Sequence, residues 1–336
     1  MTRREAMRPM TVTTAMGRLT AMERLKVMAV SAIAIALAGC AVVPAPAPAP
    51  ASAPALRDIK PAAAAPPTVG RETVNATLWM QRAAEYRIAT EQVFGLATER
   101  LASSIAAPGT AAVEQQGMDP ARLAALPTAV VVDLDETILD NAFYQARRAL
   151  AGAEFDEPSW NAWMAEGAAT AVPGAIGFLQ AASRAGHRIF YVTNRACPRG
   201  TAPGASCAER EATLRNLAAL GAPGAADPGN LLQRGDRPEW TSSKVSRRAY
   251  IAQTHRIVAL AGDDLHDFVD RAEYARRRDE LAPLFGARWF LLPNAMYGSW
   301  ERAIVAGACT PEMDAVACAA ANTARKYAAL EPDPPR

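Results

Sequence analysis

Two clusters of acidic side chains follow apolar runs in this sequence, and together they have the composition of a metal site. The first lies in AVVVDLDETILDN, where Asp133 and Asp135 stand two residues apart behind four apolar residues. The second lies in AGDDLHDF, which contains Asp263 and Asp267. Crowded carboxylates repel one another unless a cation lies among them. Mg²⁺ prefers oxygen ligands and leaves room for water and a substrate phosphate, so the clusters predict a magnesium site.

Calcium binding and simple solvation are the competing interpretations of the first cluster. An EF-hand calcium loop requires Gly at its sixth position, where this segment has Ile138. The segment also follows a strand-like run, not a helix. An acidic surface loop would be the better interpretation of an isolated Asp-x-Asp pair. The second cluster, at a corresponding position, favours the metal site.

Short apolar runs that alternate with helical stretches must position these clusters. Strand-like runs occupy residues 129–135, 187–194, 256–264 and 288–294. This alternation is typical of an α/β protein whose parallel sheet is covered by helices on both faces. Residues 73–105 carry apolar side chains at helical spacing, which predicts one long helix or a pair. Ligands bind such sheets at the carboxyl ends of the strands, where both acidic clusters lie.

The motifs resemble those of the haloacid dehalogenase (HAD) superfamily of phosphohydrolases. DLDET at 133–137 is similar to its first motif, YVTNR at 191–195 to its second, Lys244 in TSSKVSRR to the lysine of its third, and GDDLHDF at 262–268 to its fourth. More narrowly, DLDETILDN, AVPGAIGFLQ, GDDLHDF and LPNAMYGSWE resemble the class C acid phosphatases, bacterial outer-membrane lipoproteins that hydrolyse nucleoside monophosphates and related esters. The resemblance covers residues 75–301. It implies a three-layer, Rossmann-like core with a small helical cap, and Mg²⁺ as cofactor.

The acidic motif residues have distinct roles in such an enzyme. Asp133 would attack the phosphorus and form an aspartyl phosphate. Asp135 would protonate the leaving ester oxygen and later take a proton from the attacking water. The metal would be held by the Asp133 carboxylate, the backbone carbonyl of Asp135 and Asp263, with Asp267 as a ligand or as a partner of the ligands.

Thr193 and Lys244 would stabilise the phosphoryl group. The Thr193 hydroxyl can donate to a phosphoryl oxygen, and Lys244 supplies a compact positive charge. Asn194 and Arg195 are further candidates for substrate binding. Arg247 and Arg248 stand close to Lys244 and are alternative phosphate ligands. An ordinary strand end and a solvated surface lysine are the plainer interpretations of the first two residues.

The segment between the first two motifs, residues 141–172, is too long for a simple crossover and rich in aromatic residues, which predicts a small helical cap. The family resemblance implies that a nucleoside base stacks between aromatic rings, and Trp160 and Tyr297 have the best matching context. Such stacking is worth about 1–3 kcal/mol per base and tolerates different bases. Core packing is the alternative interpretation of both rings.

The N-terminal part predicts export and lipidation. In residues 1–39, basic side chains precede an apolar run that is too short to span a bilayer as a mature helix, as in a signal peptide. The run ends in LAGC, which resembles the lipobox of bacterial lipoproteins, so Cys40 would carry the lipid and anchor the protein to a membrane. Ala41 after it implies the outer membrane of the cell envelope. Residues 40–70 are rich in Pro and Ala and predict an extended spacer.

Four further cysteines agree with an oxidising compartment. Cys197 and Cys207 lie in a Pro/Gly-rich loop, and Cys309 and Cys318 lie near the C-terminus. Four thiols allow three pairings, of which the local one needs the least rearrangement of the chain. Zinc is disfavoured because neither pair has the short CxxC spacing.

Charge and composition limit the partners. Residues 1–39 hold six basic and two acidic side chains, so their removal changes the formal net charge from +2 to −2. The mature chain therefore has no general field for a nucleic acid polymer. We expect one phosphatase domain over residues 71–320, a tail over 321–336, and a small phosphomonoester as substrate. A phosphatase of another small ester, a surface lipoprotein that binds a ligand such as haem without turnover, and a homodimer are left open.

Overall fold

The structure of the protein is a computed structural model that describes residues 73–104, 107–198, 202 and 205–332. All of them fall in one compact unit, Ala64–Arg336. The signal peptide, the lipidated Cys40 and the spacer predicted for residues 1–70 lie outside the described residues. Among the helices that are described, none combines the length and the apolar character needed to cross a bilayer.

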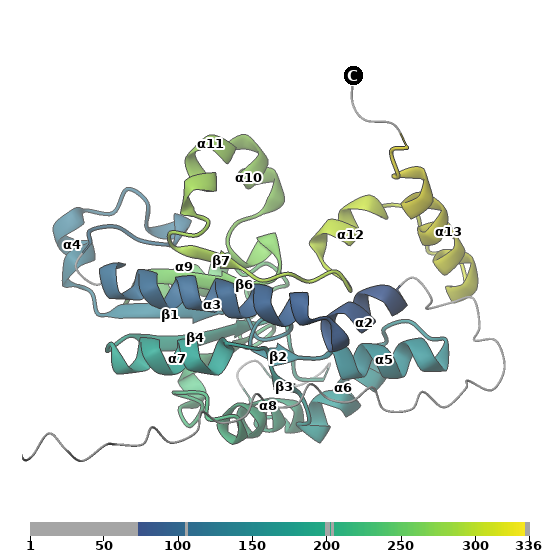
Figure 1. Cartoon of the computed structure of the whole chain (residues 1–336), viewed down its shortest axis with the longest axis horizontal. Coiled ribbons are helices and arrows are strands. Elements are labelled where there is room, and N and C mark those ends of the chain that lie inside the picture. The colour runs from purple at the N-terminus through teal and green to yellow at the C-terminus, as the bar shows by residue number, and fades with distance from the viewer. Residues whose placement is uncertain (1–72, 105–106, 199–201, 203–204, 333–336) are drawn as a thin grey trace, which may run out of the picture. The chain divides into compact units, whose positions relative to one another are not determined.

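Five parallel strands form the central sheet, in the order β5-β4-β1-β6-β7 (Figure 1). They are β1 (Thr128–Val132), β4 (Arg188–Thr193), β5 (Leu231–Gln233), β6 (Arg256–Gly262) and β7 (Trp289–Leu291). β1 lies at the centre and pairs with β4 and β6. The predicted α/β fold with a parallel sheet is confirmed, and the four strand-like runs contain β1, β4, β6 and β7. β5 escapes prediction because it offers only two consecutive apolar residues, Leu231 and Leu232, whereas the equally short β7 lies in the four-residue apolar run WFLL.

Helices cover both faces of the sheet. α3 (Ala84–Ser104) and α7 (Ala175–Arg184) pack on one face, and α9 (Val245–Ala252) packs on the other, with α10 (Arg271–Arg276) and α11 (Arg278–Leu281) beyond it. Because the central strands are buried on both faces, their sequences are continuously apolar, and every residue of β6 is buried. The core of the first face includes Phe94, Leu101, Val130, Val132, Phe178 and Leu179, and that of the second includes Val131, Phe190, Ile251, Phe268 and Trp289.

The N-terminal helical segment is a pair of helices. α2 (Val74–Arg82) ends at Ala83, which has an extended backbone, and α3 begins at the next residue. α2 packs beside α5 (Ala142–Ala151), a helix of the cap, and α3 lies against α7, β6 and β7. The pair therefore joins the cap to the sheet.

A small helical cap is inserted between β1 and β4. It consists of α5 (Ala142–Ala151) and α6 (Glu157–Glu166), enclosed by the antiparallel strands β2 (Leu139–Asp140) and β3 (Thr170–Ala171). Gly152 and Gly167 end the two helices in the left-handed conformation, at φ 62° and 61°, which glycine adopts without steric strain. At the start of α6 the side chain of Asp156 accepts the backbone N–H of Ser159 at 2.8 Å. These elements occupy the segment predicted as a cap.

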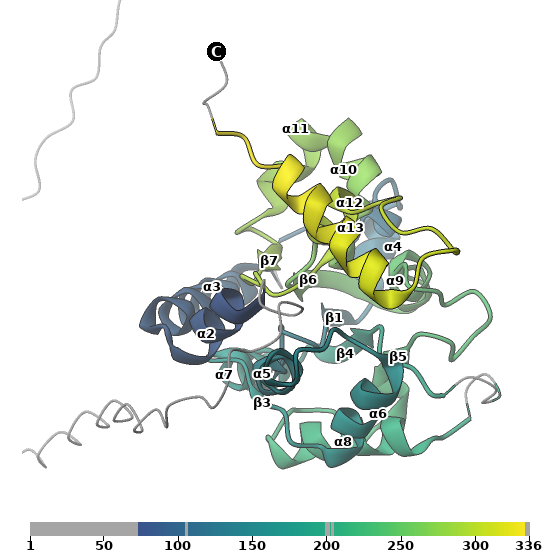
Figure 2. The same ribbon diagram turned by 90° about the vertical axis from the view of Figure 1, so that its right-hand side faces the viewer.

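The C-terminal part adds α12 (Ser299–Ile304) and α13 (Ala315–Ala328), and the Cys309–Cys318 disulfide ties the start of α13 to the segment after α12. The boundary expected between residues 320 and 321 therefore falls inside a helix. Figures 1 and 2 show α12 and α13 at the same end of the sheet as α5 and α6. The remaining helices are α4 (Pro120–Ala125), α8 (Ala208–Ala219), and the short 3₁₀ turns η2 (Val113–Gln115), η3 (Pro228–Asn230), η4 (Leu265–Asp267) and η5 (Ala282–Leu284).

Candidate active site

Carboxylates from two neighbouring strands meet at one edge of the sheet. Asp133 follows β1, Asp263 follows β6, and Asp267 lies in η4 directly after it. Oxygen atoms of the three carboxylates lie within 4.8 Å of one another. The two acidic clusters of the sequence are thus brought together, because neighbouring parallel strands end at the same edge. Three hard oxygen donors at this separation fit a divalent cation such as Mg²⁺.

Lys244, the residue before α9, inserts its ammonium group between two of these carboxylates. Its Nζ contacts Oδ1 of Asp133 and lies 2.5 Å from Oδ1 of Asp267. All three side chains are buried, with exposed fractions of 6–9%. Lys244 therefore neutralises part of the charge of the cluster and holds both carboxylates in place.

The electrostatics of the cluster favour a bound cation. Burial raises the pKa of Asp133 to about 7, against the opposing effect of Lys244 and with the help of the negative charges of Asp267 and Asp135. Burial, Asp267 and Asp133 likewise raise the pKa of Asp263 well above its usual range. Burial alone would lower the pKa of Lys244, but the charges of Asp133 and Asp267 raise it. The buried cluster carries more negative charge than one lysine can balance.

Gly262 makes room for the Asp267 side chain. A Cβ on Gly262 would lie 2.2 Å from Oδ2 of Asp267, which is far inside van der Waals contact. The same Oδ2 accepts the backbone N–H of Asp264 at 2.9 Å, and the backbone carbonyl of Asp267 accepts a guanidinium N–H of Arg248 at 2.9 Å. The glycine of the GDD segment is therefore a packing requirement for the carboxylate beside Lys244.

Asp135 is held by Arg195, which the sequence offered as a candidate for substrate binding, and by Asn141, for which it predicted no role. Its Oδ1 accepts Nε and Nη2 of Arg195, at 3.0 and 2.8 Å, and Nδ2 of Asn141 at 2.9 Å. Its Oδ2 lies 3.5 Å from the Thr193 hydroxyl. Arg195 ends the YVTNR motif and Asn141 ends DLDETILDN, so their places beside the motifs were the only signal in the sequence. We call the set Asp133, Asp135, Lys244, Asp263 and Asp267 the catalytic floor.

Thr193 and Asn194 end β4 beside the catalytic floor. Thr193 is fully buried, and its Oγ1 accepts the backbone N–H of Arg195 at 3.0 Å. Asn194 is exposed to the cleft. Arg247 donates to the Thr193 carbonyl at 2.5 Å and to Oδ1 of Asn194 at 2.7 Å. Arg247 therefore holds the end of β4 in place from a position outside the cleft lining.

The alternative that Arg247 or Arg248 binds phosphate is wrong. Both guanidinium groups are buried and neither lines the cleft. Arg248 pairs with Glu114 at 2.8 Å and donates to the backbone carbonyls of His266 and Asp267. The two arginines bind loops together, and of the three neighbouring cations only Lys244 faces the carboxylates.

The Asp263 carboxylate is oriented by two further residues. Thr137 donates its hydroxyl to Oδ1 at 3.2 Å, and Asn294, just after β7, donates its amide to Oδ2 at 2.9 Å. Glu136, beside Thr137, has a left-handed backbone at φ 60° and accepts the backbone N–H of Asn141 at 2.9 Å. A non-glycine residue keeps this conformation only where its surroundings fix it. These contacts join distant segments, which is why the sequence did not reveal them.

A cleft of about 1860 Å³ lies above the catalytic floor. Trp160 of α6 and Tyr297, which precedes α12, both line it. The Trp160 ring packs edge-on against Tyr144 at 5.1 Å between centroids, and Tyr297 is half-buried against a cluster that includes Met296. The outer walls of the cleft, as we use the term, are the cap with Phe155 and Trp160 on one side and the C-terminal segment with Tyr297, Val316 and Tyr327 on the other.

The C-terminal helix forms part of one wall. Val316, Ala320, Thr323 and Tyr327 of α13 line the cleft. Lys326 pairs with Glu301 of α12 at 2.6 Å, next to the Cys309–Cys318 disulfide. The segment expected to be a tail thus contributes to the cleft.

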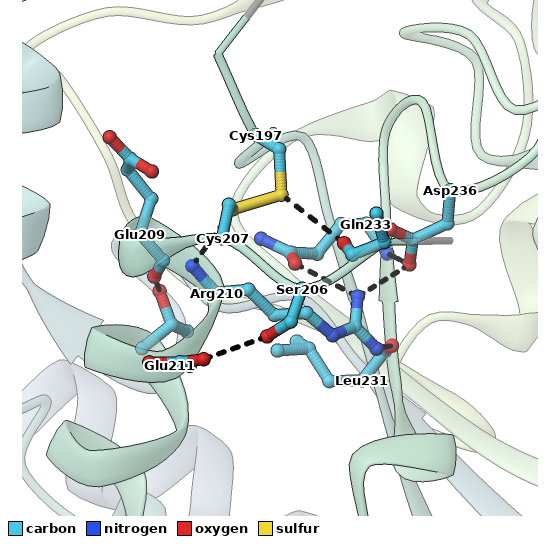
Figure 3. Close-up of a disulfide and its surroundings, with 11 residues drawn as sticks. Cys197, Ser206, Cys207, Glu209, Arg210, Glu211, Leu231, Gln233 and Asp236 are labelled. Carbon is cyan, nitrogen blue, oxygen red and sulfur yellow. Dashed lines mark hydrogen bonds and ion pairs between the residues drawn. A yellow bond between two sulfur atoms is a disulfide. The ribbon is translucent and has the colours of Figure 1, made fainter. Parts of the chain in front are cut away.

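The disulfide Cys197–Cys207 closes the loop that leaves β4 (Figure 3). At the start of α8, Arg210 donates to Gln233 at 2.9 Å and to Asp236 at 2.7 Å, which fixes the helix to the end of β5. Cys197 also lines the cleft. The two local pairs considered for the four cysteines are thus the ones present, and the first stabilises the loop that carries Asn194 and Arg195.

This fold and this site define a class of protein. The sequence profile of the HAD superfamily, subfamily IIIB (acid phosphatase), matches residues 47–300. The match covers most of the chain, so the protein belongs to this family, as the motifs indicated.

Individual relatives agree with the family assignment. Two structures of the class C acid phosphatase from Bacillus anthracis, one with tungstate bound, each have a TM-score of 0.62 and 26% sequence identity, and the match covers 79% of this chain and 99% of that one. Acid phosphatase 1 of Solanum lycopersicum is 26% identical over 171 residues, or 50% of this chain and 57% of that protein. The chain thus spans little more than half the length of this plant relative.

Proposed function

We propose that this protein is a Mg²⁺-dependent phosphomonoesterase, an acid phosphatase or 5′-nucleotidase, that acts through an aspartyl phosphate at Asp133. The observation that carries the proposal is the catalytic floor. A buried carboxylate ends the central strand in contact with Lys244, and a second carboxylate, Asp135, lines the same cleft two residues later. Membership of an acid phosphatase family supports this reaction class.

The residues of the floor divide the reaction between them. Asp133 attacks the phosphorus, the bond to the ester oxygen breaks, and Asp135 gives its proton to the departing alcohol. Asp135 then takes a proton from water, which attacks the aspartyl phosphate and releases inorganic phosphate and free Asp133. Mg²⁺, held by Asp133, Asp263 and the backbone carbonyl of Asp135, would offset the repulsion between carboxylates and phosphate.

Neighbouring groups orient the phosphoryl group and the nucleophile. Lys244 fixes Asp133 and Asp267 by direct contact and presents positive charge to a phosphoryl oxygen. The Thr193 hydroxyl, buried at the end of β4 and 3.5 Å from Oδ2 of Asp135, is the proposed donor to a second phosphoryl oxygen. The Asn194 side chain is exposed to the cleft and can contact a third. Thr137 and Asn294 keep Asp263 turned toward the nucleophile.

The proposed substrates are nucleoside monophosphates or similar small esters. Trp160 and Tyr297 line the cleft above the floor and offer aromatic surfaces to a leaving group. Stacking of a base on such rings contributes about 1–3 kcal/mol. The stacking energy depends little on which base is bound, so we expect several bases to be accepted.

We also propose that the enzyme works at the cell envelope, lipid-anchored through Cys40 and held away from the membrane by the spacer over residues 40–70. The LAGC segment supports this location, and the two disulfides suit an oxidising compartment.

The test is release of inorganic phosphate from nucleoside 5′-monophosphates by the purified protein, with EDTA or with added Mg²⁺. We expect release that EDTA abolishes and excess Mg²⁺ restores. Asp133→Asn should lower kcat by roughly 10⁴-fold or more, because it removes the nucleophile. Asp270→Asn is the matched control: Asp270 also lines the cleft but lies outside the floor, and its variant should stay within about threefold. If the folded wild type released phosphate from no monoester, the enzymatic proposal would fail and a ligand-binding lipoprotein would take its place.

A further inference from the structure

The Arg195 guanidinium is buried and donates hydrogen bonds to several neighbouring side chains. Its side chain is 1% exposed. Nε and Nη2 donate to Oδ1 of Asp135 at 3.0 and 2.8 Å, Nη2 also donates to Oδ1 of Asn141 at 3.3 Å, and Nη1 donates to the Thr213 hydroxyl at 3.1 Å. These bonds use most of the five N–H groups of an arginine. Arg195 is therefore bonded as a structural partner of Asp135, with little capacity left for a phosphate.

These bonds make the two oxygens of Asp135 different from each other. Oδ1 accepts three N–H donors, two from Arg195 and one from Asn141 at 2.9 Å. Within the described part of the chain, the one hydrogen-bond partner of Oδ2 is the Thr193 hydroxyl, at 3.5 Å. Oδ1 is thus occupied as an acceptor, and Oδ2 is the oxygen that can exchange a proton with an ester oxygen or a water in the cleft.

The same bonds connect Asp135 to the cap. The Arg195 guanidinium lies over the Trp160 ring, 5.5 Å from its centroid. The indole N–H of Trp163 donates to Oδ1 of Asn141 at 2.8 Å. Both indoles belong to α6, so the helix that lines the cleft also supports both residues that hold Asp135.

We propose that Arg195 is a positioning residue that fixes Asp135 with Oδ2 toward the leaving group and couples this orientation to the cap through Trp160. The inference rests on the proposed phosphatase function and deepens it. Without Arg195, the Asp135 carboxylate can rotate and lose its alignment with the ester oxygen. A leaving group that packs against Trp160 presses on the ring that covers the guanidinium, so binding in the cap steadies the proton donor.

The decisive experiment compares two esters that differ in their need for a proton. An alkoxide leaving group, as in a nucleoside 5′-monophosphate, requires protonation, whereas p-nitrophenolate leaves as a stabilised anion. The kcat/KM value reports the first chemical step, transfer of the phosphoryl group to Asp133. For Arg195→Met we expect kcat/KM to fall about 100-fold with the nucleotide but to stay within about threefold with p-nitrophenyl phosphate.

A matched control removes a half-buried arginine that is equally well bonded but lies outside the cleft. Arg210 donates to Gln233, Asp236 and two backbone carbonyls. Arg210→Met should leave the ratio of the two kcat/KM values unchanged, even if it lowers the melting temperature. Equal losses with both esters in folded Arg195→Met would contradict the proposal, because they would indicate a role in phosphate binding or in general structure. Unchanged values with both esters would contradict it as well.

Two milder variants keep the proposal testable if Arg195→Met does not fold. Asn141→Ser removes one donor to Oδ1 and should lower the nucleotide-to-nitrophenyl ratio about tenfold. Trp160→Leu should lower kcat for nucleotides as well as raise KM, whereas Tyr297→Leu should change KM alone, because Tyr297 has no contact with Arg195. Identical behaviour of the two aromatic variants, with no change of ratio in Asn141→Ser, would overturn the coupling. Failure of the proposed function is distinguishable, since the wild type would then hydrolyse neither ester.

Discussion

The side chains of the catalytic floor are buried or half-buried at the base of the cleft, whereas several side chains of the outer walls are largely exposed. Asp133 and Lys244 are 8% and 6% exposed, and Phe155, Val316 and Tyr327 are 60%, 71% and 70% exposed. The floor carboxylates accept hydrogen bonds from surrounding polar groups of the protein. The walls carry large apolar side chains with few partners.

This contrast assigns different tasks to the two regions. A floor whose donors and acceptors are fixed before substrate binds can stabilise the transition state without reorganisation. Walls with exposed aromatic and aliphatic surface can pack against leaving groups of several shapes, which changes ground-state binding more than the chemical step. Floor variants should therefore change kcat, and wall variants should change KM, except at Trp160, whose ring also covers the Arg195 guanidinium.

The largest effect is expected for the cation of the floor. Lys244→Met removes the charge between Asp133 and Asp267, and kcat should fall roughly 10²–10³-fold, as for other preorganised charges at a reacting group. Lys326→Met is the matched control on the wall. Lys326 also forms an ion pair, with Glu301 at 2.6 Å, but its side chain is far less buried than that of Lys244. Its kcat should stay within about twofold. Similar losses in both variants would erase the distinction between floor and wall.

Packing beneath the floor should have the next largest effect. In Gly262→Ala the new methyl group would collide with the Asp267 carboxylate, whose Oδ2 lies 2.2 Å from the position of a Cβ. We expect a loss of roughly 10–100-fold in kcat and about 1–3 kcal/mol in the free energy of unfolding. Gly177→Ala on α7 is the control, since no atom lies within 4 Å of its Cβ position. Denaturant unfolding of Gly177→Ala should show no loss of stability.

The floor should make the stability of the metal-free protein depend on pH. Burial raises the pKa of Asp133 from 3.8 to about 7, so between these values the folded protein binds more protons than the unfolded chain. The melting temperature without metal should therefore fall as pH rises from about 4 to about 7. The proposed Mg²⁺ would bind the ionised carboxylates, and its stabilising effect should grow over the same range. Asp133→Asn should flatten the metal-free profile, and a profile in the variant as steep as the wild type's would show that Asp133 is not its cause.

The smallest effect on catalysis is expected for the disulfide of the C-terminal wall. The double variant Cys309→Ser, Cys318→Ser removes a crosslink between cysteines nine residues apart in the sequence. A disulfide that closes a loop of this length stabilises the folded state by about 2–3 kcal/mol. The kcat with p-nitrophenyl phosphate should stay within about twofold, because neither cysteine is a residue of the floor. Protease cleavage after residue 308 should become faster. A loss of kcat comparable to that of Lys244→Met would contradict the separation of tasks.

The floor could be predicted from the sequence, because its acidic residues directly follow the apolar runs that form the strands. Asp133 and Asp263 directly follow apolar runs, and parallel strands that end at one edge bring such residues together. The partners of Asp135 could not be predicted in the same way. Arg195 lies 60 residues from Asp135 in the chain, and its direction depends on how β4, the cap and α8 pack around it.

The walls were predicted least well. The cap followed from a long aromatic-rich insertion, but the contact of α13 with the cleft had no local signal, since its alanine-rich sequence has no strongly apolar face. β5 was missed because its apolar run is only two residues long, Leu231 and Leu232. In each case the position is decided by packing between distant segments, and periodicity within one segment carries no information on it.

The most direct test of the central claim is to trap the covalent intermediate. The purified enzyme with Mg²⁺ would be mixed with a nucleoside 5′-monophosphate, quenched in acid within the first turnover, digested and analysed by mass spectrometry. We predict a phosphorylated peptide that contains residues 129–141, with the phosphoryl group on Asp133. Steady phosphate release with the phosphoryl group on another residue, or on none in single-turnover samples, would contradict the assignment of Asp133 as the nucleophile.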